Sequence, residues 1–301
     1  KTLNRFTNMK LLDIVDIPEL TRSNVHIGNK PLLIDKINKL ISGGHRKLQI
    51  VTDFDHTLTR HKMDDGTVVL TSFGMFRECP SIPQHYKDEY TRLSGIYKPI
   101  EADPHMNVEE KIKHMIDWYH AAHDILKGVK LPRNELVESG MKMRDCFRLG
   151  VQKMMAWSSE RAVPVLVFSA GLGESVVAAL RASQLLLPNV KVVSNFLATD
   201  ENDAIIGIKG EVIHTYNKNE TAIKGTEYYD LVKDRDNVIL MGDNIGDAGM
   251  AEGMDHCDTV IKVGFLGHGA DNLPNYLKHF DIVLVDEHSV DLVNAILKHV
   301  L

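Results

Sequence analysis

Residues 51–60 read Val-Thr-Asp-Phe-Asp-His-Thr-Leu-Thr-Arg and place two acidic side chains, Asp53 and Asp55, directly after an apolar run. That run, Leu48–Thr52, is typical of a buried strand in a parallel sheet. Both carboxylates would then lie at the carboxyl end of the strand, where open α/β sheets place their sites. In the loop that follows, the two acids can converge on one cation, which would hold the like charges together. An isolated pair of this kind is more often a solvated turn, so other segments must decide the function.

The composition is that of an ordinary globular protein. The chain has 301 residues, 44% hydrophobic and 25% charged, which is enough for one large core or for a core with a smaller domain. The net charge of −6 argues against binding of polymeric nucleic acid, although a metal ion and a few lysines could still attract a small anion. Since no apolar run approaches the length of a membrane span, we expect no membrane association.

The cysteines indicate the compartment. Cys79, Cys146 and Cys257 are far apart and form no Cys-x-x-Cys pair, so we interpret them as free thiols of a reducing environment. The first residues have neither an initiator methionine nor a signal-like apolar segment, so we expect a trimmed chain in the cytoplasm. No long apolar stripe is left after the cores are assigned, and we therefore expect a monomer.

Apolar runs that predict strands alternate with helical periodicity along most of the chain. After Leu48–Thr52, the predicted strands are Val163–Phe168, Val190–Val193, Val238–Met241, Thr259–Val263 and Ile282–Val285. The predicted helices are two within residues 8–42, of which the second is around Lys30–Ile41, then Glu174–Ala182, and Val290–Val300 with Ser289 as its cap. This alternation predicts an α/β fold with a three-layer, Rossmann-like parallel sheet.

Two segments interrupt the alternation. Residues 61–158 have mostly helical patterning, including a helix that Asn107 caps with Glu110 three residues further on. A helical insertion directly after the first strand would cover the acids as a cap. We therefore divide the chain into an α/β core, residues 1–60 and 159–301, and an inserted helical cap, residues 61–158. Residues 194–216 contain a polar turn between β-branched runs, which predicts a hairpin.

The predicted strand that ends at Phe168 is followed by residues suited to anion binding. Ser169, Ala170 and Gly171 lie between this strand and the next predicted helix. A hydroxyl and small residues at such a turn expose backbone N–H groups at a helix N-terminus, which can bind a phosphate. A plain Ser/Gly turn is the alternative reading.

The predicted strand Val238–Met241 ends in a second acidic segment. Gly242 follows it, and then Asp243 and Asp247. Asp243 at this position can ligate a hard cation, while Asp247 can orient the ligands or contact a basic residue. Lys218 precedes this strand and is of interest only because a cation there would offset phosphate charge.

The order of these segments resembles the haloacid dehalogenase superfamily of phosphohydrolases over about residues 48–290. The resemblance implies that Asp53 attacks phosphorus and forms an aspartyl-phosphate. It implies that Asp55 protonates the leaving oxygen and later deprotonates the attacking water. It further implies that Mg²⁺ is held by Asp53, by the backbone carbonyl of Asp55, and by Asp243.

The same resemblance assigns roles to the remaining polar residues. Ser169, Ala170 and Lys218 would bind the phosphoryl oxygens and stabilise their charge during transfer. Thr57 would hydrogen-bond within the acid loop, and Asp247 would support the site.

Short stretches along nearly the whole chain are similar to the cytosolic 5′-nucleotidase III family. They are Asp53–Arg60, Ile100–Pro104, Val108–Lys111, Phe168–Gly171, Val193–Asn195, Gly210–His214, Tyr216–Lys218 and Asp281–Val285. The family implies hydrolysis of nucleoside 5′-monophosphates to nucleoside and phosphate, with some phosphotransfer to other nucleosides. One branch prefers pyrimidine nucleotides, and the other also takes 7-methylguanosine monophosphate (7-methyl-GMP).

The predicted cap decides which base fits. A 7-methylguanine ring is flat and positively charged, so it favours aromatic faces and a nearby carboxylate. The cap offers Phe73, Phe76, Trp118 and Tyr119, each of which could instead be cap core, and Glu101 matches a substrate-binding glutamate of the family. Because Trp118 and Tyr119 are adjacent on a predicted helix, they point about 100° apart, and we do not expect both to face one pocket.

Two further positions help to decide between the two branches of the family. Ala122 stands where the pyrimidine branch tends to carry Ser, which favours the 7-methylguanosine branch, whereas Tyr119 stands where that branch often has a second Trp. We expect 7-methyl-GMP as the favoured substrate, with CMP and UMP also hydrolysed. The alternatives are a pyrimidine-only nucleotidase or nucleoside phosphotransferase, a phosphatase for another small molecule, and a catalytically silent nucleotide-binding protein. The intact set of acidic and basic residues argues against a silent protein.

Overall fold

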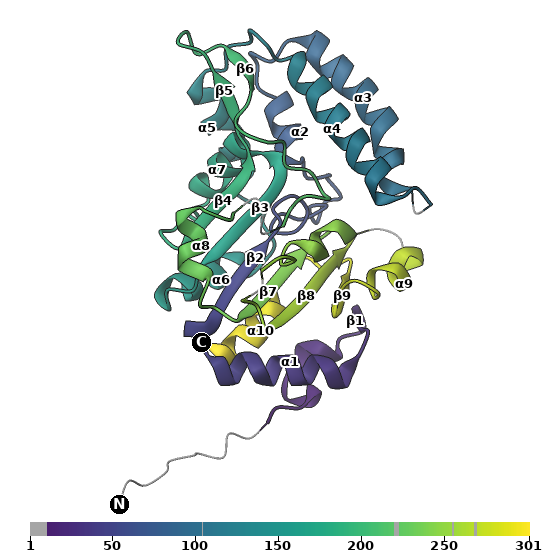
Figure 1. Cartoon of the computed structure of the whole chain (residues 1–301), viewed down its shortest axis with the longest axis vertical. Helices are drawn as coiled ribbons and strands as arrows, with labels where there is room; N and C mark the ends of the chain where they lie inside the picture. Colours follow the sequence, from purple (N-terminus) through teal and green to yellow (C-terminus); the bar gives the residue numbers. More distant parts are fainter. Residues whose placement is uncertain (1–10, 104, 220–222, 255, 268–269) are drawn as a thin grey trace, which may run out of the picture.

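The computed structural model describes residues 11–103, 105–219, 223–254, 256–267 and 270–301. Within these residues the core is a seven-stranded sheet with the order β1-β9-β8-β7-β2-β3-β4, in which only the β1–β9 pair is antiparallel (Figure 1). Its strands are β1 Val25–Ile27, β2 Leu48–Thr52, β3 Val165–Leu172, β4 Val190–Asn195, β7 Asn237–Gly242, β8 Thr259–Leu266 and β9 Ile282–Val285. The predicted parallel sheet is confirmed.

Strand β2 lies between β7 and β3 in the middle of the sheet. All five of its residues are buried, as expected for a strand that is covered on both faces. Because its neighbours are parallel to it, the carboxyl ends of β2, β3 and β7 meet at one edge of the sheet. This register brings together the segments that the sequence analysis selected.

Helices cover both faces of the sheet. One hydrophobic cluster joins Ile50 of β2 to α1 Lys30–Gly43, α6 Val151–Glu160, α7 Gly173–Ala182 and α10 Asp291–Val300. The other joins the next residue of the same strand, Val51, to α8 Glu227–Val232 and α9 Leu273–Tyr276. Successive side chains of β2 thus point into opposite clusters, which gives the predicted three-layer architecture.

The remaining α-helices and a β-hairpin lie towards the carboxyl ends of the strands, and one of them, α5 Arg133–Lys142, packs against the core helix α7 (Figure 1). They are α2 Ser72–Arg77, α3 Gln84–Ala102, α4 Val108–Asp124, α5 Arg133–Lys142, and the hairpin β5 Leu197–Thr199 with β6 Ile205–Ile208. Asn107 caps α4 as predicted, with its side chain 2.8 Å from the N–H of Glu110. The predicted hairpin is also present.

The packing of the helices favours different boundaries for the cap from the predicted residues 61–158. A third hydrophobic cluster joins α2, α3 and α4 to Leu197 and Ile205 of the hairpin, whereas α6 packs into the core cluster with α10. We therefore propose that α6 belongs to the core and that the β5–β6 hairpin belongs to the cap.

The N-terminal segment differs from its prediction. The second predicted helix is α1, which Gly44 ends with a positive φ of 65°. The first is wrong within the described residues: Ile14–Asp16 and Pro18–Thr21 form two short 3₁₀ turns, because Pro18 lacks the N–H that would continue a helix. Residues 8–10 of that prediction lie outside the described residues. The N-cap position of α10 is Val290 rather than the predicted Ser289, which lies one residue earlier and accepts the N–H of Asp291 at 3.3 Å.

Candidate active site

The loop after β2 directs two carboxylates into one cavity. The N–H of Asp53 donates to the carbonyl of Met241 on β7 at 3.0 Å, which ties the acid to the neighbouring strand. His56 has a left-handed φ of 60°, and Thr57 donates its N–H back to the carbonyl of Phe54. Both Asp53 and Asp55 line the cavity that results.

Lys218 joins two of the predicted acids. Its Nζ lies 2.6 Å from Oδ1 of Asp53 and 2.7 Å from Oδ1 of Asp247, and all three side chains are at least nine-tenths buried. Burial alone would lower the pKa of Lys218, but Asp247 and Asp53 raise it above its ordinary value. Lys218 is therefore a fixed cation beside Asp53.

Asp243 completes an acidic cluster. Carboxylate oxygens of Asp53, Asp243 and Asp247 lie within 4.8 Å of one another. The loop is held by Asp247, whose Oδ2 accepts the N–H groups of Asp243 at 3.2 Å and Asn244 at 3.0 Å, and by Tyr276, whose hydroxyl donates to the carbonyl of Asp243. The predicted strand ends thus come together.

The cluster carries more negative charge than Lys218 offsets. Burial raises the pKa of Asp53 to about 7, even though Lys218 opposes the rise. Burial and the nearby carboxylates of Asp53 and Asp247 hold the pKa of Asp243 well above its usual range. Oxygen ligands with this unmatched charge fit a hard divalent cation. The donor set is therefore compatible with the Mg²⁺ that the sequence analysis expected.

The residues that are predicted to bind an anion lie at the end of β3. Ser169 and Gly171 line the cavity, and the N–H of Gly171 donates to the hydroxyl of Ser169 at 3.0 Å. The carbonyl of Ala170 accepts the hydroxyl of Tyr119 at 2.7 Å and the amide of Asn195 at 2.9 Å. Ser169 lies in the strand itself, where the register with β4 is irregular, rather than in a turn after it.

Aromatic side chains of the cap cover this cavity, whose volume is about 200 Å³. Phe73, Tyr90, Trp118 and Tyr119 all line it. The expectation that Trp118 and Tyr119 could not both face it is wrong: their rings are 6.2 Å apart at 61°, so one helix presents two walls to the cavity. Trp118 is further fixed by stacking on Tyr97 at 5.8 Å.

Phe76 is the predicted aromatic residue that the structure places elsewhere. It is fully buried and contacts Tyr86 edge to face at 6.0 Å within the cap cluster. It does not line the cavity, because its side chain fills the cap core instead.

Glu101 lies on the cavity wall near Lys218. Its Oε1 accepts the hydroxyl of Thr215 at 2.7 Å, and its backbone carbonyl accepts Lys111 Nζ at 2.8 Å and the Tyr216 hydroxyl at 3.1 Å. The end of α3 is thereby joined to the segment that carries Lys218. A substrate-contacting role for Glu101 is compatible with this position.

Several residues of the site had no role in the sequence analysis, among them Tyr90, Ser72 and Arg148. Ser72, at the start of α2, donates to both carboxylate oxygens of Asp55. Arg148, which is 2% exposed, donates to the carbonyls of His56 at 2.6 Å and Thr57 at 2.8 Å, and so holds the acid loop. The Thr-Ser pair before the apolar α2 segment is a helix-start signal that could have indicated Ser72. Nothing in the sequence around Arg148 indicated its partners.

The prediction for Thr57 holds only for its backbone. Its hydroxyl is buried with no hydrogen-bond partner among the described residues. Within the loop the side-chain bonds come instead from Thr59, whose hydroxyl accepts the N–H of His56 at 2.9 Å, and from Thr52, whose hydroxyl donates to the carbonyl of Asp53.

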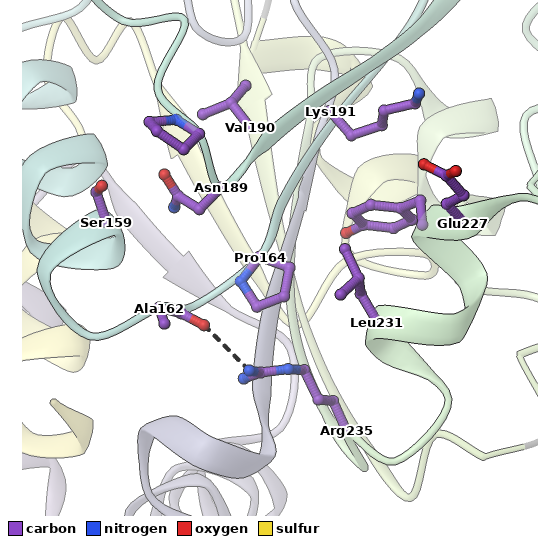
Figure 2. A pocket seen from close by; sticks show the side chains of 11 residues that line it. Ser159, Ala162, Pro164, Asn189, Val190, Lys191, Glu227, Leu231 and Arg235 are labelled. Atoms are coloured by element: carbon purple, nitrogen blue, oxygen red, sulfur yellow. Dashed lines mark hydrogen bonds between the residues drawn. The ribbon is translucent and has the colours of Figure 1, made fainter.

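A larger cavity of about 510 Å³ lies at the other end of the sheet, where β3 and β4 begin (Figure 2). Figure 2 shows Asn189, Pro164 and Leu231 around it, with Arg235 donating to the carbonyl of Ala162 at 3.0 Å. It contains none of the predicted site residues. The predicted catalytic side chains line the smaller cavity, and two of the predicted site residues, Glu101 and Lys218, also line an adjoining cavity of about 930 Å³.

Comparison with solved structures defines the class of the fold. A probable phosphoserine phosphatase from Vibrio cholerae superposes with a TM-score of 0.51 at 15% identity, over 85% of this chain and 66% of that chain. At this identity the likeness shows the fold alone, which is that of the haloacid dehalogenase-type phosphatases. The predicted fold class is confirmed.

Closer relatives define the family. The chain belongs to the pyrimidine 5′-nucleotidase (UMPH-1) family, whose model matches residues 56–301. It is 41% identical to a 7-methylguanosine phosphate-specific 5′-nucleotidase of Drosophila melanogaster over 95% of this chain and 90% of that protein. The human protein of the same name is 31% identical over 95% of each chain. The crystal structure of cytosolic 5′-nucleotidase IIIB bound to cytidine is 40% identical, with a TM-score of 0.93 over 96% of this chain and 97% of that chain.

These findings confirm the predicted family and the predicted enzyme class, a 5′-nucleotidase of the haloacid dehalogenase superfamily that acts on nucleotides. Among the residues described, none of the helices combines the length and the apolar character needed to cross a lipid bilayer.

Proposed function

We propose that the protein is a Mg²⁺-dependent 5′-nucleotidase that hydrolyses nucleoside 5′-monophosphates through an aspartyl-phosphate on Asp53. The observation that carries the proposal is the ion pair between Lys218 and Asp53 inside a cavity that Ser169 and Asp243 also line. This combination supplies a nucleophile, a fixed cation and an anion-binding strand end within one cavity.

In the proposed reaction a carboxylate oxygen of Asp53 attacks phosphorus while Asp55 gives a proton to the departing 5′ oxygen. Asp55 then takes a proton from the water that hydrolyses the aspartyl-phosphate, which returns both residues to their starting forms. Lys218 and the hydroxyl of Ser169 hold the phosphoryl oxygens and offset their charge in the transition state.

Mg²⁺ would be held by Asp53, Asp243 and the backbone carbonyl of Asp55. When bound, it would offset the charge of the acids and the phosphate and align the phosphoryl group for attack. Asp247 contributes indirectly, because its carboxylate already binds Lys218 and the loop N–H groups.

We propose 7-methyl-GMP as the favoured nucleotide, with CMP and UMP also hydrolysed. The similarity to proteins named for 7-methylguanosine phosphate supports this choice. The cavity is compatible with it, because Trp118 and Tyr119 offer aromatic faces and Glu101 offers a carboxylate for a flat cationic base.

A pyrimidine-only nucleotidase, acting as a hydrolase or as a phosphotransferase between nucleosides, is the second candidate. It is favoured by the family name and by the relative whose structure contains cytidine. In either case we propose a small-molecule substrate and a monomeric enzyme. We also propose a cytoplasmic location, which the name cytosolic 5′-nucleotidase of the relative supports.

Phosphate release from a panel of substrates with Mg²⁺ tests the proposal. The panel contains 7-methyl-GMP, GMP, CMP, UMP, AMP and a sugar phosphate. We expect 7-methyl-GMP to be preferred strongly over GMP, with CMP and UMP also turned over. Turnover of CMP and UMP alone would select the second candidate, and turnover of no nucleotide would contradict both.

Removal of the metal tests the acidic cluster separately. We expect a chelator to abolish phosphate release and added Mg²⁺ to restore it. A ligand that binds only the folded chain also raises the melting temperature, so Mg²⁺ should stabilise the wild type but not the Asp243→Asn variant. Full activity after exhaustive chelation would show that the metal assignment is wrong.

A further inference from the structure

We propose that Ser72 is a positioning residue that aligns the carboxyl group of Asp55 for proton transfer to the leaving group. This inference rests on the proposed function of Asp55 and adds a residue of the cap that fixes its geometry.

One residue holds both oxygens of Asp55. The backbone N–H of Ser72 lies 2.7 Å from Oδ1 and its hydroxyl lies 2.6 Å from Oδ2, so the two bonds fix the plane of the carboxyl group. Each oxygen keeps a further lone pair for a partner in the cavity. Asp55 lines the cavity and Ser72 does not, so Ser72 acts through Asp55 rather than on the substrate.

Ser72 itself is held from two directions. It is fully buried at the first position of α2, where Thr71 caps the helix and the N–H groups have no partner within the helix. Its hydroxyl also accepts the N–H of Leu172 on β3 at 3.2 Å. The same side chain therefore joins Asp55 to the first helix of the cap and to the strand that ends in the phosphate-binding segment.

The close approach depends on Gly171. A Cβ at this position would lie 1.9 Å from the hydroxyl oxygen of Ser72 and 3.0 Å from Oδ2 of Asp55. A side chain there would displace the bonded pair. The absence of one at Gly171 thus allows Ser72, Asp55 and the phosphate-binding segment to pack in direct contact.

Proton transfer is the step that this geometry serves. As the bond between phosphorus and the 5′ oxygen breaks, the proton of Asp55 goes to that oxygen, and Ser72 keeps its own proton throughout. Without the hydroxyl, Oδ2 loses its partner and the carboxyl group can rotate away from the leaving oxygen. A nucleoside leaving group needs the proton, whereas p-nitrophenolate is stable enough to leave without it.

The test compares kcat/KM for CMP and for p-nitrophenyl phosphate in the wild type and in Ser72→Ala. This parameter includes only steps up to departure of the leaving group, so later hydrolysis of the intermediate does not affect it. We expect Ser72→Ala to lower the ratio of kcat/KM for CMP to kcat/KM for p-nitrophenyl phosphate by about tenfold, the size of effect expected for one lost hydrogen bond. Equal losses for both substrates, or no loss, would overturn the inference.

Ser139→Ala is the matched control. Ser139 is buried and its hydroxyl donates to the carbonyl of Met75 on the same helix α2 at 3.3 Å, but it does not contact Asp55. We expect it to leave the ratio unchanged, and a similar change of ratio in this variant would show that any disturbance of α2 has the effect. Should Ser72→Ala fail to fold, Ser72→Cys keeps a similar volume with a weaker donor, and the same fall in ratio, smaller in size, is expected.

Asp55→Asn separates this inference from the proposed function. We expect it to lower the ratio more than Ser72→Ala does. If Asp55→Asn leaves the ratio unchanged, Asp55 is not the proton donor and the proposed mechanism fails. If Asp55→Asn lowers the ratio and Ser72→Ala does not, only the role of Ser72 is refuted.

Discussion

The acidic floor of the cavity and its aromatic roof are held by different interactions. The floor consists of Asp53, Asp243, Asp247 and Lys218, which are joined by ion pairs of 2.6–2.7 Å and by bonds to backbone N–H groups. The roof consists of Phe73, Tyr90, Trp118 and Tyr119, which contact one another through ring faces and edges at 6.0–6.5 Å. Tyr119 links the roof to the core, because its hydroxyl donates to the carbonyl of Ala170.

This difference predicts how each part responds to substitution. A buried charge depends on its partner, so removal of one floor residue leaves others unpaired and affects both chemistry and stability. An aromatic contact is shared among several rings and is worth about 0.5–1.5 kcal/mol beyond its area burial. We therefore expect floor substitutions to change turnover and roof substitutions to change selectivity.

The largest expected effect is on the nucleophile. Asp53→Asn should lower turnover of every nucleotide by at least about 10⁴-fold, because an amide cannot form the acyl-phosphate, and loss of a covalent nucleophile costs about this much or more in other enzymes. Phosphate release under saturating CMP is the measurement. Asp64→Asn is the control, since Asp64 is an exposed acid of the following segment. Turnover of Asp53→Asn close to that of the wild type would exclude Asp53 as nucleophile.

Lys218→Met should have the largest effect on stability. The variant leaves Asp53 and Asp247 buried without their cation, so the free energy of unfolding in the absence of metal should fall by about 3 kcal/mol. Denaturant unfolding at neutral pH measures it. Replacing Asp247 by Asn in the same chain should recover part of the loss, because one of the two uncompensated charges is then removed.

The matched control is Lys36→Met. Lys36 pairs with Asp281 at 2.7 Å, but both side chains are partly exposed to solvent. Its loss should therefore cost no more than about 1 kcal/mol. Equal losses of unfolding free energy in the two lysine variants would mean that burial does not determine how much an ion pair of the floor contributes to stability.

The sequence predicted the floor well because its residues follow strands. An apolar run that ends in Asp or Ser is a local pattern, and the parallel register of β2, β3 and β7 then brings the three ends together without further information. Lys218 belongs to no such pattern. Its place was predicted from the resemblance to a family and from the need for a cation.

The roof was predicted less well because helical spacing does not give a helix its orientation. Phe73 and Phe76 are equivalent in the sequence, yet one lines the cavity and the other fills the cap core. Similarly, Trp118 and Tyr119 are adjacent on α4, yet both line the cavity. Ser72 and Arg148 were missed because their partners are backbone groups and a carboxylate far away in sequence.

Roof substitutions should change the preference between bases. Trp118→Ala and Tyr119→Ala should each lower kcat/KM for 7-methyl-GMP about tenfold more than for CMP, because a cationic ring gains most from an aromatic face. The two kcat/KM values for each variant are the measurement. Phe76→Leu is the control, since this ring is buried in the cap core and should lower both values alike. Equal losses in Trp118→Ala would indicate a structural role for Trp118.

The smallest expected effect concerns how the stability of the fold depends on pH through a histidine beside the roof. His123 follows the roof residues on α4 and is 5% exposed, and burial lowers its pKa to about 4. Because the unfolded chain binds a proton near pH 6.5 and the folded chain does not, His123 contributes fully to stability above that pH. Stability is lost as the pH falls towards 4, and the loss amounts to about 2 kcal/mol at pH 5.

The His123→Phe variant isolates this contribution, because a buried ring remains but cannot be protonated. The difference in melting temperature between pH 7.5 and pH 5 should be smaller in the variant than in the wild type. His105→Phe is a suitable control, since His105 is exposed in the same part of the chain. Parallel pH profiles for wild type and His123→Phe would show that protonation of His123 does not set the loss of stability at low pH.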